Sequence, residues 1–452
     1  MSGAAASQGG TWVSKASNHA RRRRMLEQAA VIVRHVFGYL VVLARLDRVV
    51  PFHRGVFGHA RRSARYTRAE HVRLAVEELG VASIKIGQIL STRGDVLPPA
   101  YQVEFAKLQD GARPEPEAAI RSVLVAELGR PVDTIFTEFD PDPLAAASIG
   151  QAHAAVLADG TEVVVKVRRP GVVDQVGLDL EILDRTVRVI SRWSRTARRY
   201  DLAGLTNEFA ATLRSELDYE READNAEEFA ANFADDATLH IPRVYRDLTT
   251  SRVLTLERLR GLKVDDLDAL DAAGIDRVVL AQHATTAMLK MVFEHGLFHA
   301  DPHPGNFFIE PDGRIGLIDF GMVGTVDSTT RSALSAVLVA LVSQDTGPLV
   351  DAFLELGATT TPPDRGLLTR DFGQLIADDL SRPLSQIVLG PLLLDVLTIV
   401  RRHRLRLPPN LALLAKTFAM CEGIAAQLDP TFRMTVAITP YLPQLLAPHP
   451  VP

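Results

Sequence analysis

The fold is decided by Phe298-His299-Ala300-Asp301-Pro302-His303-Pro304-Gly305-Asn306-Phe307, followed by Asp319-Phe320-Gly321. An Asp, an Asn five positions later and an Asp-Phe-Gly thirteen beyond that reproduce the spacing of a protein-kinase catalytic loop and its magnesium-binding motif. Phosphoryl transfer needs a carboxylate that orients the nucleophile, together with an amide oxygen and a second carboxylate that hold Mg²⁺. The spacing therefore predicts that Asp301 orients the nucleophile, while Asn306 and Asp319 bind the metal.

A transition-metal site is the main alternative for this stretch. His299, Asp301 and His303 alternate along the chain and could form a metal cluster, and Asp-Phe-Gly on its own arises by chance in many chains. Against this, a Pro-Asp-Gly turn at 311–313 and an apolar run at 315–318 place a strand directly before Asp319. A strand ending at the Asp is the context that a magnesium ligand of this kind requires, so we favour the kinase-like interpretation.

Length and composition predict a globular protein of two or three lobes. The chain has 452 residues, of which 47% are hydrophobic and 23% charged. The lone Cys421 argues against disulfides or a thiolate metal site, and we expect a buried small residue there. The net charge of −5 hides an asymmetry, because residues 1–65 carry 12 Lys and Arg against 2 acidic residues. A cationic start on an acidic body favours an anionic partner, either a membrane surface or nucleic acid, and we expect the membrane rather than nucleic acid.

The N-terminal region is predicted to be partly disordered and to carry an amphipathic helix. Arg21 to Arg24 precede an apolar stretch over 29–44 that is too short and too charged to span a bilayer. One interpretation is a helix lying among lipid headgroups with its arginines on phosphates. The other is a helix packed on the body, with arginines that are merely solvated.

A helical extension should follow this basic segment. Thr67 and Glu70 form a capping-box pattern that predicts the start of a helix. Lys85 and Gln88 recur at helical spacing and would lie on one face of a second helix.

Residues 129–168 change to strand patterns. The ranges 135–139, 152–157 and 162–167 read as strands, and the last carries Lys166 among β-branched residues. Its place well before the catalytic loop matches the lysine that kinases use to reach the nucleotide phosphates, although an exposed edge lysine is the simpler alternative. Where kinases have a glycine-rich loop, this chain has a stiffer alanine-rich one that we expect to hold nucleotide. Its predicted nucleotide-binding residues are Ala145, Ala146, Ala147 and Ser148.

The segment between strand lysine and catalytic loop should complete the nucleotide site. Residues 215–225 are predicted to be helical and acidic, and one of their glutamates should pair with Lys166. A strand over 252–259 places Glu257 at the connection between the lobes, where it would contact nucleotide. Helices are expected over 276–296 and 329–343. No Ala-Pro-Glu follows the Asp-Phe-Gly, which disfavours an ordinary peptide kinase.

Taken together, these motifs resemble the UbiB/AarF family of atypical protein-kinase-like proteins, from about residue 65 to 340 and weakly through Leu428-Asp429-Pro430. Four motifs occur in the family's order: Lys85-x-Gly87-Gln88, the alanine-rich loop, Glu216-x-Asp218, and the stretch from His299 to Asn306. The resemblance implies an α+β, bilobal protein-kinase-like fold with an added N-terminal helical extension and a helical C-terminal region. The implied divisions are 1–65 (basic segment), 66–128 (extension), 129–260 (N-lobe) and 261–452 (C-lobe with helical tail).

The resemblance also implies the roles of further residues. Lys85 and Gln88 would fold over the active site and contact Glu216 and Asp218 as a regulatory cover. Glu222 would be the partner of Lys166 and, with Asp301, part of the catalytic set. ATP or ADP and Mg²⁺ would be the cofactors. Val81-Ala82-Ser83 departs from the more usual Pro-Thr-Phe, and the paired C-terminal transmembrane segments of some members are missing here.

The expected function is an atypical ATPase, or a small-molecule or lipid kinase, that supports isoprenoid quinone or lipid metabolism. It would lie in the cytoplasm, peripherally associated with the membrane, with anionic lipids, a quinone precursor or lipid, and quinone-biosynthesis proteins as partners. A nucleotide-gated scaffold with little turnover and a true protein kinase are the alternatives.

Overall fold

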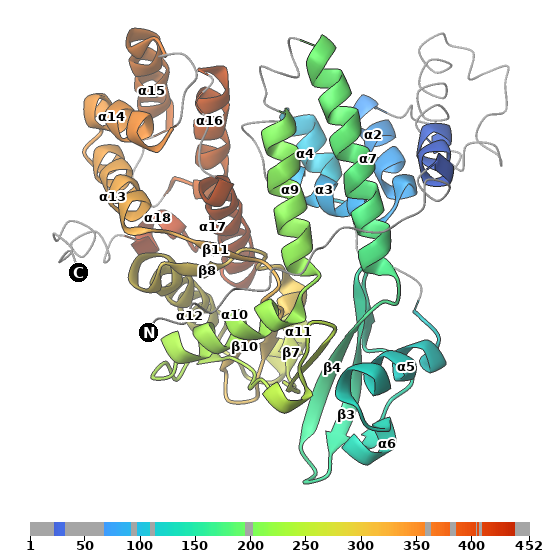
Figure 1. The fold of residues 1–452 in the computed structure, drawn as a ribbon. Helices are drawn as coiled ribbons and strands as arrows, with labels where there is room; N and C mark the ends of the chain where they lie inside the picture. The colour runs from blue at the N-terminus through green and yellow to red at the C-terminus, as the bar shows by residue number, and fades with distance from the viewer. Residues whose placement is uncertain are drawn as a thin grey trace, which may run out of the picture.

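The computed structural model describes residues 22–31, 67–91, 97–108, 114–194, 202–357, 363–379, 386–403, 405 and 409–438. In this part of the chain, two lobes of mixed helix and strand are joined to an N-terminal helical extension and a helical C-terminal region (Figure 1). The predicted α+β, kinase-like organisation is therefore confirmed. The smaller lobe carries Lys166 on its sheet and the larger one carries the catalytic loop, so the site lies where the lobes meet.

The N-lobe is built on an antiparallel five-stranded sheet in the order β1-β3-β4-β6, with β2 paired to β3. Val163, Val165 and Val167 of β4 are fully buried on one face, and burying each stabilises the lobe by roughly 1.5–3 kcal/mol. Because side chains alternate along a strand, Lys166 faces the other side, opposite Leu254 of β6. The strands are β1 (Phe136–Phe139), β2 (Ala145–Ala146), β3 (Gly150–Leu157), β4 (Glu162–Arg168) and β6 (Val253–Glu257).

The buried face of this sheet is covered by α5 (Glu117–Leu128) and the short α6 (Val132–Ile135). Ile120 and Leu124 of α5 are fully buried and join the same core as the valines of β4. The division predicted at residue 128 therefore separates α5 from the sheet on which it packs. In the structure, α5 forms part of the N-lobe core.

Two long helices follow β4 and carry the extension. They are α7 (Val172–Trp193) and α9 (Leu202–Glu216), and α2 (Arg68–Leu79), α3 (Val81–Ser91) and α4 (Pro99–Phe105) lie beside them (Figure 1). Ala82 of α3 joins a buried cluster with Val176 of α7 and Leu213 of α9. The predicted capping box is present, since Glu70 N donates to Thr67 Oγ1 and Thr67 N donates to Glu70. The extension is thus packed on the helices that lead to the active site.

The predicted acidic helix over 215–225 is two helices instead of one. α9 ends at Glu216, and α10 (Tyr219–Asn232) begins after Asp218, whose carboxylate accepts from Glu220 N. An Asp that satisfies a free N–H of the first turn favours a new helix start over continuation. This break sets the direction of α10, which carries Glu222.

The C-lobe surrounds the catalytic loop with short strands and long helices. β8 (Leu297–His299) pairs with β11 (Val323–Thr325), and β5 (Leu239–His240), β10 (Ile315–Leu317), β9 (Phe307–Ile309) and β7 (Leu262–Lys263) form a second sheet in that order. The predicted helix over 276–296 is α12 (Arg277–Lys290) followed by a π-helical turn, η3 (Met291–His295). The remaining elements are α11 (Leu267–Ala272), α13 (Ser328–Val342), α14 (Thr346–Leu356), α15 (Arg365–Asp379), α16 (Leu389–Arg402), α17 (Pro409–Leu428), α18 (Met434–Ile438) and the 3₁₀ turns η2 (Arg246–Leu248) and η4 (Pro304–Asn306).

The described part of the basic N-terminal segment is a helix over residues 22–31 that contacts α7. Arg24 Nε donates to Asp179 Oδ1 at 2.7 Å, and Gln28 Nε2 donates to the same oxygen at 2.9 Å. Arg22 and Arg23 are exposed. Arg24 is therefore anchored to α7, and most of the predicted apolar stretch over 29–44 lies outside the described residues. Among the residues that the structure describes, no helix combines the length and hydropathy needed to cross a bilayer.

Candidate active site

Lys166 stands between two carboxylates at the junction of the lobes. Its Nζ lies 2.5 Å from Glu222 Oε1 of α10 and 3.4 Å from Asp319 Oδ2. Burial opposes the charged form of Lys166, but the charges of Asp319 and Glu222 outweigh it and raise its pKa. The side chain is therefore a fixed cation, and Glu222 is the partner that the family resemblance implies.

Asp319 has an unusual backbone conformation and a pKa held low by a neighbouring charge. Its φ is +64°, a left-handed conformation that non-glycine residues seldom adopt and that is held here by the surrounding contacts. Gly321 N donates to Asp319 Oδ1 at 3.2 Å. The Lys166 charge, opposed by burial, lowers the pKa of this carboxyl, and Lys85 contributes in the same direction. Asp319 therefore stays ionised and directed towards Lys166.

The catalytic loop is tied to Asp319 through a buried histidine. His299 Nε2 donates to Asp319 O at 2.6 Å, and Asp301 N donates to His299 Nδ1 at 3.3 Å. Asn306 Nδ2 donates to Asp301 O at 3.0 Å, and Ile318 N donates to Asn306 O at 3.0 Å. The structure thus brings Asp301, Asn306 and Asp319 together, as the sequence predicted.

The alternative transition-metal cluster does not form. Both ring nitrogens of His299 are used in backbone hydrogen bonds, and burial lowers its pKa, which keeps the ring neutral. His303 caps η4 by accepting from Gly305 N through Nδ1. In the described part of the chain, no three His, Cys, Asp or Glu side chains are grouped closely enough to hold a metal on their own. The oxygen atoms of Asp319 and Asn306 remain the donors for a cation that nucleotide phosphates would also coordinate.

Contacts of α10 lock the Asp-Phe-Gly segment against the N-lobe. Asn225 Nδ2 donates to Phe320 O at 2.8 Å, and Phe229 packs on the Phe320 ring with centroids 5.1 Å apart. Glu222, Asn225 and Phe229 recur at helical spacing, so one face of α10 holds both Lys166 and Phe320. Sequence reasoning did not find Asn225 or Phe229, although their spacing from Glu222 was the available signal.

The alanine-rich loop is held by Arg169, which also forms an ion pair with Glu115. Ala145 and Ala146 form β2, and Arg169 Nε donates to Ala147 O at 2.9 Å. The same guanidinium donates to Glu115 Oε1 at 2.7 Å, and Ser148 is buried. Arg169 thus ties the loop to Glu115. Stiffness of the loop stays a prediction. Contact between this loop and nucleotide stays a prediction.

One contact of the predicted cover is present in the structure. Lys85 Nζ lies 3.1 Å from Glu216 Oε2, and both side chains are largely buried. Gln88 Nε2 donates to Leu108 O at 3.1 Å, which ties α3 to the end of its own extension. Asp218 acts as the N-cap of α10. Of the predicted cover contacts, the one between Lys85 and Glu216 is thus present.

Glu257 ends β6 at the connection between the lobes, as predicted. Its carboxylate accepts from Arg243 N at 3.1 Å and lies 3.5 Å from His240 Nε2. These contacts fix the strand end. Nucleotide contact by Glu257 stays a prediction.

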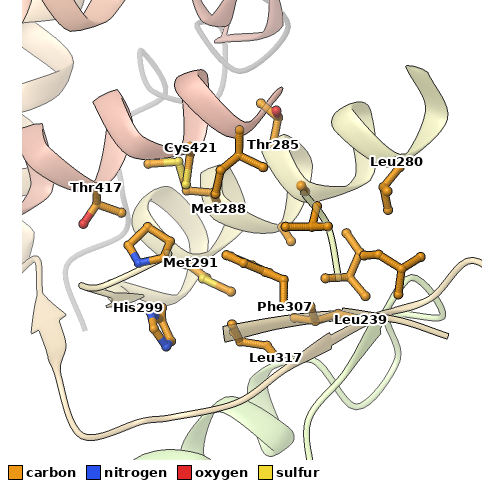
Figure 2. A pocket seen from close by; sticks show the side chains of 17 residues that line it. Leu239, Leu280, Thr285, Met288, Met291, His299, Phe307, Leu317, Thr417 and Cys421 are labelled. Carbon is orange, nitrogen blue, oxygen red and sulfur yellow. The ribbon is translucent and has the colours of Figure 1, made fainter. Parts of the chain in front are cut away.

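An apolar cavity lies behind the catalytic loop (Figure 2). Its wall includes His299 of β8, Phe307 of β9, Met288 of α12 and two residues of α17, Thr417 and Cys421. Cys421 is partly buried instead of fully buried as predicted, and desolvation raises the pKa of its thiol to about 12, which makes it an unreactive small side chain. The C-terminal helix α17 therefore reaches the back of the site.

Comparison with known proteins agrees with this geometry. The chain matches the ABC1 atypical kinase-like domain over residues 107–352 and the UbiB helical domain over residues 373–433. "Probable protein kinase UbiB" of Aliivibrio fischeri is 33% identical over 420 residues, covering 89% of this chain and 77% of the relative. A chloroplastic protein of Arabidopsis thaliana named "ACTIVITY OF BC1 COMPLEX KINASE 7" is 36% identical, covering 85% of this chain and 55% of the relative.

A solved structure shares the arrangement. The complex of Rv3197 with erythromycin from Mycobacterium tuberculosis superposes with a TM-score of 0.57 at 26% identity, covering 82% of this chain and 95% of that one. Fold and site together define an atypical kinase-like protein. The chain belongs to the ABC1 family of such proteins and carries the UbiB helical domain after the kinase-like domain.

Proposed function

We propose that this protein is an ATP- and Mg²⁺-dependent ATPase, or a small-molecule or lipid kinase, acting at a membrane surface in isoprenoid quinone or lipid metabolism. The observation that carries the proposal is the position of Lys166, which lies 2.5 Å from Glu222 and 3.4 Å from Asp319. Asp319 is linked in turn to Asp301 through His299. Phosphoryl-transfer enzymes of the kinase type need this combination of lysine, paired glutamate and two aspartates.

The donor set fits a magnesium ion. Asp319 supplies an ionised carboxylate, and Asn306 donates through Nδ2 to Asp301 O, which leaves its Oδ1 as a ligand atom. Hard oxygen donors from one carboxylate and one amide are typical of Mg²⁺ bound together with phosphates. When bound, Mg²⁺ neutralises the charge that develops on the phosphates during transfer.

Lys166 and Asp301 have different roles in the proposed reaction. Lys166 is held charged and in place by Glu222, so that it can meet phosphate oxygens without losing its orientation. Asp301 carries a partly exposed carboxylate that can accept a hydrogen bond from an acceptor hydroxyl or water and take its proton.

Phosphate release from Mg-ATP by the purified full chain tests the catalytic assignment. We expect Asp301→Asn to lower turnover by about 100-fold or more while nucleotide still binds, because it removes the orienting base. Asp319→Asn should abolish the Mg²⁺ dependence of nucleotide binding. Asp395→Asn, an exposed carboxylate of α16, is the matched control and should leave both unchanged. Unaltered Mg-nucleotide binding and phosphate release in Asp319→Asn would disprove the metal assignment.

The choice among acceptors needs the same assay with different additions. Stimulation by anionic liposomes or a phenolic quinone-precursor mimic supports a role in lipid or quinone metabolism. Transfer of phosphate to a peptide in trans would favour a protein kinase instead. No turnover under any of these conditions, with nucleotide still altering partner binding, would favour a scaffold.

Membrane binding is best tested with a variant that leaves the contact between Arg24 and Asp179 intact. Removing the whole N-terminal segment would also remove the hydrogen bonds of Arg24 and Gln28 to the buried Asp179. A loss of lipid binding in that variant would not distinguish a lost lipid contact from misfolding. Replacing the exposed Arg22 and Arg23 with Gln keeps that anchor intact. Flotation with anionic liposomes should weaken in this double variant, because each basic residue near the surface contributes about 1 kcal/mol. Unchanged flotation would remove these arginines from the lipid contact.

A further inference from the structure

The C-terminal helical domain delivers a lysine to the catalytic loop. Lys416 Nζ of α17 lies 3.0 Å from Asp301 Oδ1, although 115 positions separate the two residues in sequence. Both side chains are partly exposed, at 26% for Lys416 and 38% for Asp301. Solvent therefore reaches both members of the pair.

The catalytic loop has no strong cation of its own. The sequence from Asp301 to Asn306 contains neither Lys nor Arg, and His303 lies 4.0 Å from the other carboxylate oxygen, Asp301 Oδ2. Lys166 is already engaged by Glu222 and Asp319. Phosphoryl transfer spreads negative charge over the equatorial oxygens of the moving group, and a cation placed there lowers the barrier strongly. Lys416 occupies the position from which such a cation could act.

The helix that carries Lys416 is fixed to the catalytic strand. Asn410 Nδ2 at the start of α17 donates to Thr325 O of β11 at 3.0 Å, and β11 pairs with β8, which leads into the catalytic loop. Thr417, directly after Lys416, and Cys421, five residues after it, line the same apolar cavity as His299 (Figure 2). Because these contacts lie on both sides of Lys416 in α17, they fix the position of its backbone relative to the catalytic loop.

We propose that Lys416 is a catalytic residue that contacts the transferred phosphoryl group, and that Asp301 holds its ammonium in place before substrate binds. This inference rests on the proposed function and extends its site into the UbiB helical domain. An acceptor oxygen oriented by Asp301 lies within hydrogen-bonding distance of the carboxylate, so a cation on the same carboxylate reaches the oxygens of the phosphorus under attack. Lys416 has the long flexible side chain needed for this small movement.

The phosphoryl transfer requires no change in the protonation state of Lys416. The acceptor oxygen forms a bond to the terminal phosphorus of ATP, the bond from that phosphorus to the bridging oxygen breaks, and ADP leaves with the electron pair. Asp301 takes the proton of the acceptor. Lys416 stays protonated throughout and stabilises charge on the phosphoryl oxygens. The kinase-like domain alone, over residues 107–352, would lack this cation.

Phosphate release and nucleotide affinity in the full chain test the inference. We expect Lys416→Met to lower kcat by about 100-fold, as for loss of one preorganised charge donor. Nucleotide affinity and the unfolding midpoint should stay close to wild type, because a partly exposed ion pair contributes little to folding. Lys416→Arg should recover most of the loss. Arg370→Ala, which removes a 72% exposed cation of α15, is the matched control and should keep full activity.

A second measurement separates this inference from the proposed function. The affinities for Mg-ADP with and without aluminium fluoride, an analogue of the moving phosphoryl group, are compared in wild type and Lys416→Met. If aluminium fluoride tightens the binding of Mg-ADP to wild type but not to Lys416→Met, the role of Lys416 is supported. Absence of turnover in the acceptor assay would overturn only the proposed function. Turnover within twofold of wild type, increased turnover, or equal analogue binding in both proteins overturns the role of Lys416.

Discussion

Lys166 of β4 and Glu222 of α10 form an ion pair of 2.5 Å, and the glutamate is only 6% exposed. The pair is made while Phe320 is fully buried against Phe229 of the same helix. A single face of α10 therefore joins the N-lobe lysine to the Asp-Phe-Gly segment of the C-lobe. The structure thus holds Lys166, Glu222 and the Asp-Phe-Gly segment in one connected assembly.

Neutralising Glu222 should weaken both the fold and the site. Glu222→Gln keeps the shape but removes the charge that holds Lys166, and we expect a loss of about 1.5–3 kcal/mol in the free energy of unfolding, the range for a charged hydrogen bond. ATP affinity should fall roughly tenfold, equivalent to about 1.4 kcal/mol. Urea unfolding and nucleotide titration measure the two effects. The exposed neighbour Glu220→Gln is the control, and equal behaviour of the two variants would contradict the assignment.

Gly150, next to the alanine-rich loop, has no room for a side chain. A Cβ at this position would lie 2.8 Å from Val167 O and 2.1 Å from Tyr219 Oη. Since the first of these atoms belongs to the backbone of β4, the sheet itself must shift, and we expect Gly150→Ala to cost about 1–3 kcal/mol of stability in urea unfolding. Gly423→Ala, in α17 with no atom within 4 Å of the new Cβ, is the control and should stabilise by up to about 1 kcal/mol.

The residues that the sequence identified are those whose positions are fixed by local chain geometry. Asp301, Asn306 and Asp319 are separated by one short hairpin, so their spacing in sequence translates directly into proximity in space. Lys166 was recognised because it is the lysine within a β-branched strand that precedes the loop. The capping box at Thr67 was also local, and it is present in the structure.

The contacts that the sequence did not reveal join segments far apart in the chain. Lys416 reaches Asp301 across 115 residues, and Arg24 reaches Asp179 across 155. Such distances depend on how whole helices pack, and no spacing rule encodes them. The helix break at Asp218 was missed for a different reason, since an acidic run gives no indication that one of its members caps a new helix.

The cover formed by the extension should be energetically coupled to α9. Lys85 and Glu216 are 15% and 9% exposed, so removing one partner leaves a charge in a poorly hydrated place. We expect Lys85→Met and Glu216→Met each to destabilise the protein by about 3 kcal/mol, and the double variant to be much less affected than their sum. Urea unfolding of the four proteins measures the coupling. Additive losses would show that the pair does not hold α3 in place.

The N-lobe should lose stability in mild acid through His153, which is fully buried in β3. Its Nδ1 donates to Asp140 O at 2.8 Å, and its Nε2 accepts from Gln151 Nε2 at 2.8 Å, which requires a neutral ring. Burial lowers the pKa of His153 below its ordinary value of 6.5, so protons bind the unfolded chain more strongly. Its contribution to stability is therefore complete above about pH 6.5 and declines as the pH falls towards the lowered folded pKa.

Unfolding midpoints of wild type and His153→Gln between pH 8 and 5 test this prediction. Wild type should lose stability more steeply below pH 6.5 than the variant, because the variant has no proton to take up at this place. Gln151 cannot simply rotate its amide to accept from a protonated ring, since its Oε1 already accepts from Glu115 N at 2.7 Å. His283→Gln in α12, outside this network, is the control for general effects of losing a histidine. Parallel pH curves for wild type and His153→Gln would show that this histidine does not govern the acid sensitivity of the lobe.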